Sequence, residues 1–64
     1  MKSFLVLGSG SWGSALALYL AKQGHQVVLW GHDVNAMAAC AKTRVNEQYL
    51  PHFIFPANVT FSSS

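Results

Sequence analysis

The chain has 64 residues, of which 52% are hydrophobic and 9% are charged. Because an ordinary domain has roughly 100–150 residues and a chain this short buries little of its apolar surface, we interpret it as one part of a longer protein. Its net charge of +2 includes no basic run, which gives no support to a nucleic-acid-binding surface. The single cysteine, Cys40, cannot form an internal disulfide, which fits a reducing cytoplasm.

An apolar stretch near the start of the chain raises two alternatives, a signal peptide and a membrane-spanning helix. No charged residue occurs in residues 4–21, and both kinds of segment need such a stretch. The run Gly-Ser-Gly-Ser at residues 8–11 divides it into two short pieces. We therefore expect neither a cleaved leader nor a membrane span.

The first thirty residues predict two strands joined by a helix. Residues 3–7 are an apolar run that ends at a glycine, which is typical of a strand buried on both faces of a parallel sheet. Residues 11–23 predict a helix, with Leu16 and Leu20 on one face and Gly24 in the left-handed position just beyond its end. Residues 26–30 are β-branched and aromatic, which predicts a second strand. These elements make a right-handed βαβ unit with parallel strands.

The rest of the chain has a weaker pattern. Asp33 or Asn35 can cap a second helix that runs to about Lys42. Prolines interrupt residues 45–64, where residues 59–61 are a candidate for another short strand and residues 62–64 for a frayed end. The chain is thus predicted to be the N-terminal portion of an α/β domain with a doubly wound parallel sheet.

The residues between the first strand and the first helix match the pattern G-x-G-x-x-G, with Gly8, Gly10 and Gly13 as its glycines. Gly8 permits the tight turn, Gly10 lets a pyrophosphate approach the backbone, and Gly13 lets the helix pack closely on the sheet. The unpaired N–H groups at the helix N-terminus would face the phosphates. We predict a Rossmann-type NAD(P)-binding domain, although the same glycines could merely turn the chain.

Three residues near this turn have open alternatives. Trp12 either packs in the core or lies near the cofactor, with its N–H free to bond. Asp33 is a candidate for the ribose hydroxyls, because NAD enzymes often place an acid after the second strand, but a helix cap is the favoured role. His32 could donate to a 2′-phosphate or be a solvated loop residue. The uncharged Gly31 followed by a possible donor at His32 favours NADP as the cofactor and leaves NAD open.

No other chemistry is indicated. His25, His32 and His52 share no spacing typical of metal ligands, and the lone cysteine is far from a metal-binding pattern. We assign no metal site and no catalytic residue, and we expect Cys40 to be a small apolar residue on the second helix.

The motifs together resemble the NAD(P)-dependent glycerol-3-phosphate dehydrogenases. Residues 6–17 are similar to that family's opening G-x-G-x-W-G-[TS]-A, and residues 27–33 to its second strand and cofactor-selecting turn. Arg44, Asn46, Tyr49, Leu50 and Pro51 match its R-x-N-x-x-Y-L-P segment. The resemblance covers nearly the whole chain, although members of the family are several times longer.

The resemblance implies reduction of dihydroxyacetone phosphate to sn-glycerol 3-phosphate by NADPH or NADH, for phospholipid synthesis in the cytoplasm. It also implies that Ser11, Trp12 and His32 contact the cofactor, with Tyr49 near it. The family's catalytic lysines, its ligands for the substrate and its helical C-terminal domain have no counterpart in residues 1–64. The isolated chain is therefore expected to be inactive, and a homodimer remains open.

Two alternatives stay beside this interpretation. One is another Rossmann reductase of a 2-keto or 3-hydroxy acid, which would share the glycine turn but not the segment from Arg44 to Pro51. The other is a nucleotide-sensing module without enzymatic activity, since a fold does not by itself determine a function.

Overall fold

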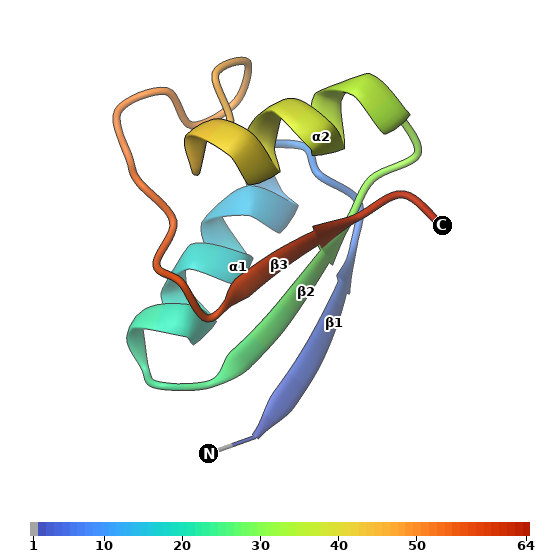
Figure 1. Ribbon diagram of the computed structural model, residues 1–64. Coiled ribbons are helices and arrows are strands. Elements are labelled where there is room, and N and C mark those ends of the chain that lie inside the picture. Colours follow the sequence, from blue (N-terminus) through green and yellow to red (C-terminus); the bar gives the residue numbers. More distant parts are fainter. Residues whose placement is uncertain (1) are drawn as a thin grey trace.

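A computed structural model describes residues 2–64 and shows three strands and two helices in that range (Figure 1). Strands and helices alternate along the chain, as a βαβαβ fold requires. The elements are β1 (Ser3–Leu7), α1 (Ser11–Lys22), β2 (Gln26–Trp30), α2 (Val34–Thr43) and β3 (Val59–Ser62). This arrangement confirms the predicted α/β fold with a Rossmann-type βαβ unit.

The three strands form one parallel sheet in the order β1-β2-β3. Val6 of β1 lies opposite Leu29 of β2, and Leu29 lies opposite Phe61 of β3. Because both crossovers step in the same direction along the sheet and share one handedness, α1 and α2 lie on the same face (Figure 1). Because the strands are parallel, the carboxyl ends of β1 and β2 lie at the same edge of the sheet.

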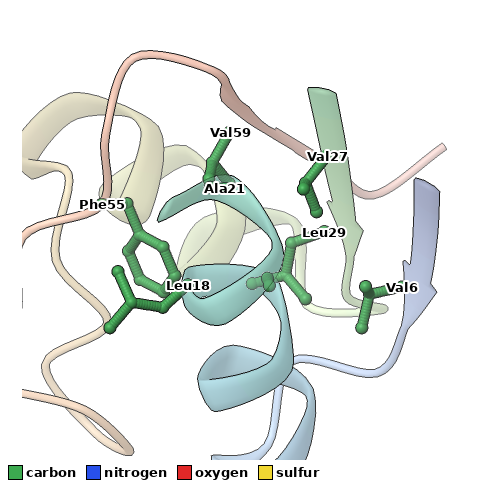
Figure 2. Close-up of a cluster of buried hydrophobic side chains, with 8 residues drawn as sticks. Val6, Leu18, Ala21, Val27, Leu29, Phe55 and Val59 are labelled. Atoms are coloured by element: carbon green, nitrogen blue, oxygen red, sulfur yellow. The ribbon is translucent and has the colours of Figure 1, made fainter. Parts of the chain in front are cut away.

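The core lies between the sheet and α1. Alternate strand residues face α1, as the period of two in a strand requires, and Phe55 packs against them from the segment before β3 (Figure 2). Leu29 is completely buried and Phe55 is 2% exposed. The buried cluster consists of Val6, Ala17, Leu18, Ala21, Val27, Leu29, Phe55 and Val59.

The opposite face of the sheet differs from the prediction. Strand β1 was expected to be buried on both faces, but Leu5 is 62% exposed and Leu7 is 72% exposed. Both helices cover the other face, so no element in residues 2–64 packs over these leucines. The expectation of a doubly buried strand is wrong for this segment because an apolar run cannot show which of its faces is covered.

The helix ends agree with the predictions to within one residue. Helix α1 ends at Lys22, and Gly24 has the expected left-handed φ of 91°. Asp33, not Asn35, caps α2, since an Asp33 carboxylate oxygen accepts a hydrogen bond from the N–H of Ala36 at 3.1 Å. Cys40 of α2 is buried, and this burial raises the pKa of its thiol, as befits a small apolar residue.

The segment after α2 returns to the sheet through Arg44. Its guanidinium donates to the carbonyl oxygens of Pro56 and Val59 and lies 5.2 Å from the ring centre of Phe61. The backbone of Arg44 has a positive φ of 65° and ends α2. Strand β3 includes Ser62, so the expected frayed end is wrong there. Neither helix in the described range is long and apolar enough to cross a bilayer.

Candidate nucleotide-binding site

A hollow of about 340 Å³ lies at the carboxyl ends of β1 and β2. In open parallel sheets, ligands bind at this edge. The glycine turn forms one wall, the residues after β2 and the first turns of α2 form the second, and the segment after α2 forms the third. The lining residues are Gly8, Ser9, Gly10, His32, Asp33, Ala36, Met37, Asn46, Gln48 and Tyr49.

Gly8 and Gly13 bring the turn and the first helix together. Gly8 has a φ of 103°, which side-chain-bearing residues rarely adopt, and its N–H donates to the carbonyl of Trp30 at 2.8 Å. A Cβ on Gly13 would collide with the carbonyl oxygen of Gly8. The start of α1 therefore packs directly on the turn, and any side chain at position 13 would force the two apart.

Gly10 differs from these two glycines. It precedes α1 with φ −67° and ψ −173°, which any residue can adopt, and a Cβ there would meet nothing within 4 Å. The protein's own packing therefore leaves open space at Gly10, and that space can admit a bulky group from outside. A pyrophosphate fits such a cradle.

The N-terminus of α1 has the electrostatics that an anion requires. The first intrahelical bond runs from the N–H of Ser14 to the carbonyl of Gly10 at 2.9 Å, so the N–H groups of the three preceding helical residues have no partner within the helix. The first turn contains no acidic residue, and no side chain caps it. The partial positive charge of the helix end is thus free to attract phosphate.

The residues after β2 divide into a capping residue and an exposed one. Asp33 accepts from the backbone of α2 as its cap, whereas His32 is exposed and lines the hollow. Before them, Gly31 is buried, and a Cβ on it would lie 2.6 Å from the Ser9 hydroxyl oxygen and 2.9 Å from the Met37 sulfur. The structure therefore gives Gly31 a packing role that the sequence did not reveal.

Most of the predicted site residues meet around this hollow, and three do not line it. Gly8, Gly10, His32, Asp33 and Tyr49 surround the hollow together. Ser11, Trp12 and Gly13 belong to the adjoining first turn of α1.

Trp12 is 85% exposed and is not a core residue of this segment. Trp12 lines a separate, mainly apolar hollow along β1 with Leu5, Leu7 and Leu16. The alternative in which Trp12 packs into the core is therefore wrong for this segment.

Asn46 is a site residue whose role the sequence reasoning missed. It lines the hollow yet is only 6% exposed. Its amide nitrogen donates to the carbonyl of Ser9 at 2.9 Å and to the hydroxyl of Ser14 at 2.8 Å. Asn46 is part of the R-x-N-x-x-Y-L-P segment, so the resemblance marked the residue, but only the structure shows what it contacts. No cluster of three potential metal ligands occurs among residues 2–64.

Comparisons with known proteins agree with this geometry. The family model for the NAD-dependent glycerol-3-phosphate dehydrogenase N-terminus matches residues 3–64. The glycerol-3-phosphate dehydrogenase (NAD(P)+) of Thioalkalivibrio sulfidiphilus is 61% identical over 51 residues, which are 80% of this chain and 15% of that protein. The enzyme of the same name from Edwardsiella ictaluri is 48% identical over 61 residues, 95% of this chain and 18% of that protein.

A solved structure has the same fold. The crystal structure of glycerol-3-phosphate dehydrogenase from Coxiella burnetii superimposes with a TM-score of 0.88 at 39% sequence identity. The match covers 92% of this chain and 18% of that one. The chain therefore spans less than a fifth of the length of these relatives.

Proposed function

The chain belongs to the NAD-dependent glycerol-3-phosphate dehydrogenase family by its match to that family's N-terminal region, and from this premise we propose that it builds the start of a cofactor site. The complete protein would be an NAD(P)H-dependent cytoplasmic enzyme that reduces dihydroxyacetone phosphate to sn-glycerol 3-phosphate for phospholipid synthesis. Residues 1–64 would be the first part of its nucleotide-binding domain, and a helical C-terminal domain would follow. The complete enzyme could act as a homodimer.

The observation that carries this proposal is the hollow between the glycine turn and the end of β2. The open space at Gly10 and the uncapped start of α1 suit a pyrophosphate. His32 and Tyr49 line the same hollow, where the adenosine half of the cofactor would lie. Ser11 and Trp12 would contact the cofactor through the first turn of α1.

The bound nicotinamide would supply the hydride that reduces the ketone carbon. The residues of this chain would bind and orient the cofactor, because backbone donors and a helix end can fix the pyrophosphate without taking part in the chemistry. The groups that hold the substrate and protonate its oxygen would come from the rest of the protein.

The end of β2 favours NADP over NAD in this proposal. Asp33, the acidic residue among the described residues that line the hollow, is engaged as the cap of α2. The exposed imidazole of His32 can donate a hydrogen bond to a 2′-phosphate. Gly31 cannot be replaced by an acid without displacing Ser9 or Met37, so the position directly after β2 carries no charge that would repel the phosphate.

The test is a titration of the full-length protein with NADPH and NADH, followed by turnover with dihydroxyacetone phosphate. We expect both cofactors to bind, NADPH more tightly, and this ketone phosphate to be reduced. Turnover with 2-keto acids alone would indicate a different Rossmann reductase. Binding without turnover of either substrate class would indicate a nucleotide-sensing module.

A further inference from the structure

The peptide bond between Ser9 and Gly10 is held by two side chains, Ser14 from the adjoining helix α1 and Asn46 from a distant part of the chain. The Ser9 carbonyl oxygen accepts from the Asn46 amide at 2.9 Å and from the Ser14 hydroxyl at 3.0 Å. Asn46 also donates to the Ser14 hydroxyl oxygen at 2.8 Å, which closes a triangle of three hydrogen bonds. The side chains of Ser14 and Asn46 are 0% and 6% exposed, so water competes little for these bonds.

The hydrogen bonds also determine how the Asn46 amide is oriented. A carbonyl oxygen can only accept, so the group of Asn46 that faces Ser9 must be the NH₂. The Ser14 hydroxyl gives its single proton to the same carbonyl and therefore accepts from Asn46. No alternative assignment satisfies all three contacts, so the Asn46 amide has one orientation.

The orientation of this carbonyl decides where the next N–H points. In a trans peptide the C=O and N–H bonds are antiparallel across one plane, and no cis peptide occurs in residues 2–64. With the Ser9 oxygen directed toward Asn46 and Ser14, the Gly10 N–H is directed the opposite way. A Cβ built on Gly10 meets nothing within 4 Å, so there is open space beside this peptide for a phosphate group.

We propose that Asn46 is a positioning residue for the cofactor pyrophosphate, acting through the Ser9–Gly10 peptide. The inference rests on the proposed function, since it assumes that a pyrophosphate occupies the glycine turn. Asn46 itself need not touch the cofactor. It keeps the turn in the conformation that binds, so that less ordering is required when the cofactor arrives.

The chain contains a matched control in Asn58. Its amide nitrogen also makes two hydrogen bonds, to the carbonyls of Ala21 at 2.8 Å and His25 at 2.7 Å. Asn46 therefore anchors the N-terminal end of α1 and Asn58 the C-terminal end. Replacing either asparagine with alanine removes two hydrogen bonds donated by an amide nitrogen, to a carbonyl and a hydroxyl for Asn46 and to two carbonyls for Asn58. Only the replacement of Asn46 affects the glycine turn.

The experiment compares Asn46→Ala and Asn58→Ala in the full-length protein. Equilibrium titrations with NADPH and NADH give the two dissociation constants, and steady-state kinetics give KM and kcat. For Asn46→Ala we expect both dissociation constants and both KM values to rise about tenfold, equivalent to about 1.4 kcal/mol. The pyrophosphate is common to both cofactors, so the ratio of the two constants should stay the same. The kcat at saturating cofactor should also stay the same.

Asn58→Ala should lower the unfolding midpoint about as much as Asn46→Ala does, because each variant loses two hydrogen bonds. It should leave both dissociation constants unchanged. Ser14→Ala provides a second variant if Asn46→Ala does not fold, and it should also weaken both cofactors in parallel. The inference is overturned if Asn46→Ala or Ser14→Ala binds both cofactors as the unmodified protein does. It is equally overturned if Asn58→Ala weakens binding as much as Asn46→Ala. Failure of the unmodified protein to bind either cofactor would instead refute the proposed function, and this inference with it.

Discussion

Substituting Gly10 and Gly13 separately distinguishes a glycine needed by a ligand from one needed by the fold. At Gly10 an added Cβ meets nothing within 4 Å, and the backbone has an extended conformation open to any residue. At Gly13 the added Cβ collides with the backbone carbonyl of Gly8. A backbone atom cannot rotate away as a side chain can, so a substitution at Gly13 should lower the stability of the fold. A substitution at Gly10 should instead lower the affinity for the cofactor.

The magnitudes follow from these surroundings. Replacing Gly10 with alanine reduces the entropy of the unfolded chain, worth about 0.4–1 kcal/mol of stability, but alanine is a poorer N-cap than glycine by about the same amount. We expect the free energy of unfolding to change by less than about 1 kcal/mol as these terms offset each other. Gly13→Ala should cost about 1–3 kcal/mol, as overpacking does elsewhere.

Cofactor affinity should show the reverse order. In Gly10→Ala the added methyl group would occupy the space of a pyrophosphate oxygen. A penalty of about 1–3 kcal/mol corresponds to a roughly fivefold to hundredfold loss of affinity. Gly10→Val should weaken binding further and still fold. The assay is urea unfolding of the full-length variants beside calorimetric titration with NADPH. Normal NADPH binding by Gly10→Ala would refute the role of Gly10 in holding phosphate. If Gly10→Ala lost as much stability as Gly13→Ala, the open space at Gly10 would be refuted.

Three further predictions concern cofactor choice, stability and completeness. His32→Asp in the full-length protein should raise the dissociation constant of NADPH about tenfold and leave that of NADH within about twofold. The reason is that only NADPH has a 2′-phosphate, which would lose its charge-assisted hydrogen bond from His32. An unchanged ratio of the two constants would make His32 a surface residue without a role in cofactor choice. Arg44→Lys should lower the free energy of unfolding by about 1.5–3 kcal/mol, because an ammonium cannot both reach the carbonyls of Pro56 and Val59 and stack on Phe61; an unchanged urea midpoint would show that these contacts contribute nothing net. The isolated 64-residue chain should not oxidise NADPH in the presence of dihydroxyacetone phosphate, and turnover at the rate of an ordinary dehydrogenase would contradict our assignment of the chemistry to the rest of the protein.

Local interactions explain the parts of this fold that the sequence predicted. The strand, glycine turn and helix over residues 3–22 depend on propensity, glycine geometry and capping, which act between neighbours in the chain. The cap of α2 is equally local, since Asp33 reaches only three residues ahead. The second strand and the βαβ topology followed because a parallel pair requires a crossover of one handedness.

The features that escaped prediction depend on contacts between distant residues. Asn46 meets Ser9 across 37 positions in the chain, and no local pattern encodes such a contact. Gly31 looked like an uncharged loop residue until the fold brought Ser9 and Met37 against it. Tyr49 was tied to the cofactor only by resemblance, and the structure now places it on the wall of the hollow.

The sequence by itself determined that this chain forms parallel strands joined by helices, and that a glycine turn of the dinucleotide-binding type opens the first helix. The tertiary structure alone decided which face of the sheet is covered and which glycines are needed for packing. It also decided which polar side chains hydrogen-bond to the turn. The physical reason is that secondary structure is encoded by neighbours within a few residues, whereas burial and side-chain hydrogen bonding depend on what the completed fold brings alongside.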